Sequence, residues 1–104
     1  MSDFEDVFVY GSLRDSRVQK AVIGRKITGE NDFIDGHRVE NAKISIFCFP
    51  MIIPDDSCSV EGLVLKLTGE ELSKVDDFEN DHYIRKRLKL RSGREAWVYE
   101  GNLK

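Results

Sequence analysis

The sequence has little of several residue types that often mark particular kinds of protein. Its 104 residues include two cysteines, two histidines, two prolines and one tryptophan. Cys48 and Cys58 do not form a C-x-x-C pair, and His37 and His82 show no metal-ligand spacing. We therefore expect no metal site and, because no export signal is evident, two reduced thiols.

Long apolar runs and basic runs are absent too. The first residues are acidic and lack the apolar core of a signal peptide. No stretch approaches the ~20 apolar residues that a membrane span needs. The net charge is −3, which does not favour binding to nucleic acid. We expect a cytoplasmic protein with neither nucleic acid nor a membrane as a partner.

The composition is typical of a folded domain. Hydrophobic residues make up 40% of the chain, aromatic residues 10% and charged residues 34%, which disordered segments rarely combine. The length suggests one domain, over residues 1–104. Heptads and long apolar stripes do not occur, so we expect a monomer.

The apolar pattern predicts more strands than helices. Two prolines close together exclude a regular central strand, and Thr68 with Glu71 forms a capping box. The expected elements, in order, are a strand over 7–10, a helix from Ser12 that ends at Gly24, two strands within 25–47 with a turn at Glu40-Asn41, an apolar loop between Pro50 and Pro54, a turn at 55–57, a strand over 60–67, a helix after Thr68, and a hairpin of 83–91 and 94–100. The connections look too short for repeated βαβ units, so the pattern predicts an α+β fold on a mixed or antiparallel sheet that can close into a barrel.

The junction Tyr10-Gly11-Ser12-Leu13 is one place where chemistry could occur. Glycine allows a ligand to approach the backbone closely, and the first amides of a helix lack intrahelical acceptors. Such a junction can hold a carboxylate or an oxyanion. The alternative is an ordinary turn in which Ser12 only caps the helix, and the local spacing by itself favours this alternative.

The acidic segment 76–81 is the second place. A carboxylate at the end of a helix, close to other carboxylates, has a raised pKa if it is partly buried, and Glu79 is the candidate. Such a group suits general acid–base catalysis. The alternative is a solvated acidic turn that Arg85 and Arg87 neutralise, and the pattern by itself favours this alternative.

Six segments, taken in order, resemble the γ-glutamyl cyclotransferase-like family, which includes the AIG2-like proteins. They are the "YGSLR" loop within 9–14, the aromatic-Pro segment 49–54, the "VEG" strand 60–64, the helix end 72–79 with its final glutamate, the "Y-x-R" of 83–85 and the "AWVY" strand within 95–99. Each motif is weak by itself, but together they extend from about residue 7 to residue 100 and are specific for the family.

The resemblance implies a mixed, mainly antiparallel β-barrel with two flanking helices and a polar cavity. It implies that the backbone of Tyr10, Gly11, Ser12 and Leu13 binds a γ-glutamyl group and that Glu79 is the catalytic acid and base. The implied reaction releases 5-oxoproline from a γ-glutamyl amine or γ-glutamyl amino acid and needs no cofactor.

Tyr83 and Arg85 are candidates for supporting the pocket. Asn80 stands where the family often has glycine, and the loop before Tyr83 is short, so the substrate stays open. The same fold could instead act on another amide, bind a small metabolite without turnover, or serve as an interaction protein.

Overall fold

The computed structural model of the chain describes residues 4–44, 47–79 and 82–101, and for 42–44 and 47–49 it describes the main chain alone. The Cys48 side chain and Asn80 therefore lie outside the described residues. The elements are β1 (Phe4–Val9), a 3₁₀ turn (Ser12–Arg14), α1 (Ser16–Val22), β2 (Glu30–Ile44), β3 (Phe47–Thr68), α2 (Gly69–Glu79), β4 (Tyr83–Lys89) and β5 (Glu95–Gly101).

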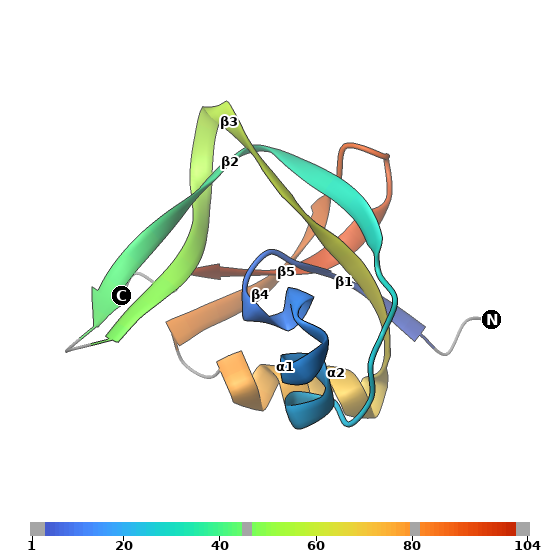
Figure 1. The fold of residues 1–104 in the computed structure, drawn as a ribbon. Helices are drawn as coiled ribbons and strands as arrows, with labels where there is room; N and C mark the ends of the chain where they lie inside the picture. Colours follow the sequence, from blue (N-terminus) through green and yellow to red (C-terminus); the bar gives the residue numbers. More distant parts are fainter. Residues whose placement is uncertain (1–3, 45–46, 80–81, 102–104) are drawn as a thin grey trace.

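The strands form one curled sheet in the order β2-β3-β1-β5-β4. The pairings β1–β3, β2–β3 and β4–β5 are antiparallel. β5 runs parallel to β1, and it also meets β3 in parallel where Glu100 pairs with Ile52. Helices α1 and α2 lie together on one side of the sheet (Figure 1). The predicted mixed, mainly antiparallel barrel with two flanking helices is confirmed, with the sheet as a half-barrel.

β2 and β3 form a long two-stranded arm that bends in the middle (Figure 1). The register shifts between Asp35 and His37, where the four residues 55–58 of β3 face Gly36 of β2, and such a bulge bends a strand. The predicted turn at Glu40-Asn41 is wrong, because β2 continues through it.

The predicted loop between Pro50 and Pro54 is also wrong. Both prolines lie within β3, opposite Asn41 and His37. In this half of the arm β3 pairs with β2 on one side and meets β5 only at Ile52. Proline has no N–H group to donate to a neighbouring strand. It is tolerated there, because an edge without a partner strand needs no such donor.

The helix ends follow local side-chain chemistry. The Thr68 hydroxyl accepts a hydrogen bond from Glu71 N at 3.1 Å, and the Glu71 carboxylate accepts one from Thr68 N at 2.9 Å, so the capping box is confirmed. Gly24 follows α1 at φ +99°, a conformation that glycine adopts without strain, and ends the helix as predicted.

The start of the first helix differs from the prediction. Ser12 caps nothing with its side chain and instead begins a three-residue 3₁₀ turn. The α-helix begins at Ser16, and the Asp15 side chain is its N-cap, accepting a hydrogen bond from Arg17 N at 2.8 Å. The cap of this helix is therefore Asp15 and not Ser12.

Two layers of apolar side chains pack on the two faces of the sheet. Val7 and Val9 point to the helices, whereas Phe8 between them points to the inside of the curl. These three residues are at most 5% exposed, which explains why this half of β1 is a continuous apolar run. β4, at the edge of the sheet, is more open, and its Ile84 is 39% exposed.

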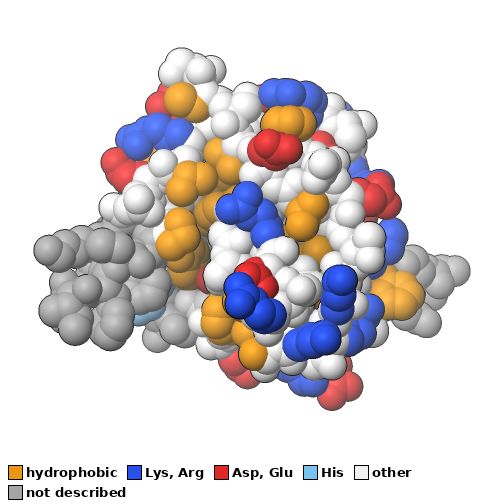
Figure 2. Space-filling view, in the orientation of Figure 1, with side chains coloured by type: hydrophobic (Ala, Val, Ile, Leu, Met, Phe, Trp, Pro, Cys, Tyr) orange, Lys and Arg blue, Asp and Glu red, His pale blue; other side chains and the backbone are white. Residues whose placement is uncertain are grey.

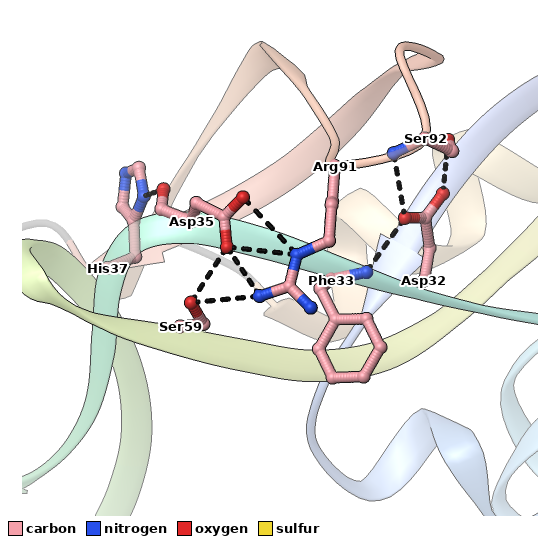
Figure 3. Close-up of polar contacts among 7 residues, drawn as sticks. All are labelled: Asp32, Phe33, Asp35, His37, Ser59, Arg91 and Ser92. Atoms are coloured by element: carbon pink, nitrogen blue, oxygen red, sulfur yellow. Dashed lines mark hydrogen bonds and ion pairs between the residues drawn. The ribbon is translucent and has the colours of Figure 1, made fainter.

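The tip of the β4–β5 hairpin is tied to β2 (Figure 3). The buried Asp32 carboxylate accepts a hydrogen bond from the Ser92 hydroxyl at 2.6 Å, and Arg91 N donates to Phe33 O at 2.8 Å. The Arg91 side chain lies over the Phe33 ring and pairs with Asp35 at 2.6 Å. These contacts join β2, at one edge of the sheet, to the hairpin that contains β4, at the other edge.

Candidate active site

A cavity of about 390 Å³ opens where the end of β1 meets the end of α2. Its wall is formed by residues 8–13, by Pro50 of β3, by Phe78 and Glu79 of α2, by His82 and Tyr83, and by Tyr99 of β5. The predicted loop 10–13 and Glu79, nearly 70 residues apart in the chain, thus line one cavity. The parallel pairing of β1 with β5 and the packing of α2 against β1 bring them together.

Residues 10–13 form the loop that lines the cavity. The amides of Ser12 and Leu13 open the 3₁₀ turn and have no acceptor within it. The Gly11 carbonyl accepts hydrogen bonds from Arg14, both N at 3.1 Å and Nε at 3.2 Å. The buried Gln19 side chain donates to Leu13 O at 2.9 Å. A turn this short has little dipole, so any anion there would rely on individual N–H groups.

Glu79, the last residue of α2, is half-buried in the cavity wall. Burial raises the pKa of its carboxyl group from 4.5 to about 7, because an apolar surrounding disfavours the charged form. The sequence suggested the helix end and neighbouring acids as causes, but desolvation is the cause that the structure supports. Among the described residues, none hydrogen-bonds this carboxyl group.

Three tyrosines surround Glu79, and each hydroxyl is bound elsewhere. Tyr10 donates to Tyr99 O and accepts from Ile52 N at 3.0 Å. Tyr83 donates to Pro50 O at 2.7 Å, and burial, followed by the Glu79 charge, raises the pKa of Tyr83 to about 12. Burial also raises the pKa values of Tyr10 and Tyr99. All three therefore stay protonated at neutral pH.

Tyr99 donates its hydroxyl proton to Asp76 Oδ1 at 2.6 Å. Arg85 does not line the cavity; it lies over the Trp97 ring, with its Nε 3.6 Å from Asp76. Of the two predicted supporting residues, Tyr83 thus lines the cavity, whereas Arg85 contacts Asp76, which in turn binds the cavity residue Tyr99.

Several cavity residues were not predicted. Tyr99 was predicted only as part of the last strand, and nothing local indicated Phe78 or Pro50 as wall residues. A second, wider cleft of about 940 Å³ adjoins the first and shares Tyr10–Ser12 and Pro50 with it. Over the described residues, no group of three His, Cys, Asp or Glu side chains could hold a metal ion. Within the same residues, no helix is long and apolar enough to cross a membrane.

Solved structures share this architecture. A structure described as γ-glutamyl cyclotransferase matches with a TM-score of 0.82 and 16% identity, over 95% of this chain and 67% of that one. The solution structure of an Arabidopsis thaliana protein matches with a TM-score of 0.81 and 22% identity, over 97% of this chain and 64% of that one. At such identities the likeness establishes the fold, which is γ-glutamyl cyclotransferase-like.

The sequence comparisons establish the family. The model of the family "Gamma-glutamyl cyclotransferase, AIG2-like" matches residues 7–103, and the chain belongs to this family. AIG2-like protein C of Arabidopsis thaliana is 34% identical over 86 residues, which are 82% of this chain and 49% of that protein. AIG2-like protein D of the same plant is 36% identical over 86 residues, 81% of this chain and 55% of that protein. The chain spans about half the length of these curated relatives.

Proposed function

We propose that the protein is a γ-glutamyl cyclotransferase-type enzyme that releases 5-oxoproline from a γ-glutamyl amine or γ-glutamyl amino acid. The observation that carries the proposal is a single cavity lined both by Glu79, which has a pKa of about 7, and by the loop of residues 10–13. In the reaction the substrate's α-amine attacks its own γ-carbonyl carbon. A ring C–N bond forms, the γ-amide C–N bond breaks, and the freed amine leaves.

The cavity suits a small zwitterionic head group. Among the residues that the structure describes, none that lines the cavity is a lysine or an arginine. The α-carboxylate of the substrate would therefore be held by main-chain N–H groups of the loop, not by a salt bridge. Such groups can also stabilise the oxyanion that forms at the γ-carbonyl, and one such donor is typically worth ~10²–10³ in rate. Folding the substrate back on itself would contribute ~7–11 kcal/mol through orientation.

Glu79 would transfer the proton. Ionised, it accepts a proton from the α-ammonium group, which frees the amine as the nucleophile. Protonated, it then gives that proton to the departing nitrogen. The ring nitrogen loses its second proton as the lactam forms, and the freed amine takes up this proton and leaves as an ammonium ion. A carboxyl group with a pKa near 7 is well matched to both steps, because both of its forms are populated at neutral pH.

The test is turnover of a substrate panel by wild-type protein and by Glu79→Gln. The purified protein is incubated with γ-glutamyl amino acids and γ-glutamylamines, and 5-oxoproline is measured by mass spectrometry. Gln keeps the shape but cannot accept the proton, so we expect a loss of ~10²–10⁴ in turnover. Glu70→Gln, an exposed position on the same helix, is the matched control and should keep full activity.

Two results would contradict the proposal. Normal turnover by Glu79→Gln would remove Glu79 from the catalytic role. Binding of γ-glutamyl compounds without any 5-oxoproline would instead support a non-catalytic binding module on the same fold.

A further inference from the structure

We propose that Asp76 is a positioning residue: by accepting the hydroxyl proton of Tyr99, it keeps this hydroxyl from hydrogen-bonding the Glu79 carboxyl group. The inference rests on the proposed function for its purpose, since the carboxyl group that it protects is the proposed acid and base. Its geometric content can be tested without any turnover.

Asp76 and Glu79 lie on the same face of α2, because residues three apart in a helix are neighbours. Tyr99, from β5, meets this face and lines the cavity. Its hydroxyl proton is held by Asp76 Oδ1 at 2.6 Å. Without an acceptor at position 76, the next carboxyl group on that helix face is that of Glu79, which lines the same cavity as Tyr99.

Arg85 forms an ion pair with the same Asp76 oxygen that accepts the Tyr99 proton. Its guanidinium group lies 4.3 Å above the Trp97 ring, and its Nε is 3.6 Å from Asp76 Oδ1. Arg85 Nη1 is buried and has no hydrogen-bond partner among the described residues. The arrangement orients the Asp76 carboxylate to accept the hydroxyl proton of Tyr99. It also gives a role to the arginine of the "Y-x-R" motif, which does not line the cavity.

The other groups that face Glu79 behave in the same way. Tyr10, after β1, and Tyr83, on β4, donate their hydroxyl protons to the carbonyls of Tyr99 and Pro50. His82, in the turn before β4, is the remaining titratable cavity residue among those described. Every tyrosine hydroxyl near Glu79 thus has another acceptor. Because a hydrogen bond to a carboxylate favours its charged form, this arrangement keeps the carboxyl group basic.

The experiment is a titration of the Glu79 carboxyl carbon by NMR in full-length protein labelled with ¹³C at glutamate carboxyl groups. Glu79→Gln assigns the signal. In Asp76→Ala we expect the titration midpoint to fall by ~1 pH unit, a tenfold increase in acidity, because the Tyr99 hydroxyl now donates to Glu79. Asp76→Asn keeps an oxygen acceptor for Tyr99, so its midpoint should equal that of the wild type.

The double variant Asp76→Ala/Tyr99→Phe separates the hydroxyl from the charge. It lacks the donor, so its midpoint should return to the wild-type value. A low midpoint that persists in the double variant would show that loss of the Asp76 charge is responsible, and it would overturn the proposal. An unchanged midpoint in Asp76→Ala would also overturn it.

Tyr99→Phe by itself gives a further check if Asp76→Ala does not fold. With Asp76 present the hydroxyl is already engaged, so its removal should leave the midpoint unchanged, and a shift of ~1 pH unit would refute the inference. If the protein turns over a γ-glutamyl compound, the acidic limb of its kcat/KM profile should move with the midpoint in each variant. If the protein shows this titration pattern but turns over no γ-glutamyl compound, the proposed function is refuted while the positioning role of Asp76 is supported.

Discussion

Replacing Glu79 by glutamine should make the protein more stable, and the gain should depend on pH. Burial raises the pKa of Glu79 from 4.5 to about 7 in the folded state. Below pH 4.5 the carboxyl group is protonated in both the folded and the unfolded chain. Between these two pH values only the folded state keeps the proton, so a rise in pH favours unfolding. Above about pH 7 both states are ionised, and the folded protein contains a poorly solvated charge.

The magnitude follows from this interval. The free energy of unfolding falls by about 1.4 kcal/mol for each pH unit over which the folded state holds one more proton than the unfolded state. Over the interval from 4.5 to about 7 the loss is about 3 kcal/mol. That is a large fraction of the ~5–15 kcal/mol that stabilises a typical domain. Glutamine is neutral throughout and avoids this loss.

Urea unfolding of both proteins at several pH values between 4 and 8.5 would measure the effect. Groups other than Glu79 titrate in both proteins, so they cancel in the difference. The stability advantage of Glu79→Gln should grow from near pH 4.5 to near pH 7 and then stay constant. Glu70→Gln, on the exposed side of the same helix, should show no such growth. A difference that does not change with pH would refute a buried, high-pKa carboxyl group at position 79.

Three further perturbations test the framework. Gly62→Ala should lower the free energy of unfolding, measured in urea, by ~1–3 kcal/mol. A Cβ at this position would lie 2.7 Å from the Phe8 ring and 2.5 Å from the Val9 carbonyl oxygen. Unchanged stability would refute this close approach of the two strands. Asp32→Ala should lower the free energy of unfolding by ~1–3 kcal/mol and speed amide hydrogen exchange at Ser92, which loses its acceptor. Exchange protection equal to that of the wild type would count against the contact between Asp32 and the hairpin. Gly11→Val should weaken the binding of a γ-glutamyl dipeptide, measured by calorimetry, because the valine methyl groups would occupy space in the cavity that Gly11 lines. Thermal stability should change little, since a Cβ fits at 3.7 Å from its nearest neighbour, Pro50. Equal affinity would exclude the loop from binding.

The features that the sequence predicted correctly depend on contacts between near neighbours. Thr68 and Glu71 cap each other across three residues, and Gly24 ends its helix by its own backbone freedom. Such patterns need no knowledge of the rest of the chain. The strand over 60–67 and the final hairpin were visible for the same reason, because alternation and turn residues are local signals.

The features that the sequence did not predict depend on distant partners. Pro50 and Pro54 exclude a central strand, but whether their strand is central is decided by the sheet order, in which this half of β3 lacks a second full partner. Tyr99 looked like strand packing, because its role depends on Asp76, 23 residues away. The pKa of Glu79 also needed the fold, since burial and not neighbouring charge raises it.

The hydrogen bonds of the cavity wall limit what chemistry it can perform. Tyr10, Tyr83 and Tyr99 have committed their protons to acceptors in the wall, and their raised pKa values keep these protons in place. They give the cavity shape and a low dielectric but are poor proton donors to a substrate. In the proposed reaction Glu79 would transfer the proton and the loop amides would hold the negative charge, and a reaction whose nucleophile belongs to the substrate requires these two functions. The same burial that makes Glu79 costly to ionise would therefore suit it to the proposed role of a base at neutral pH.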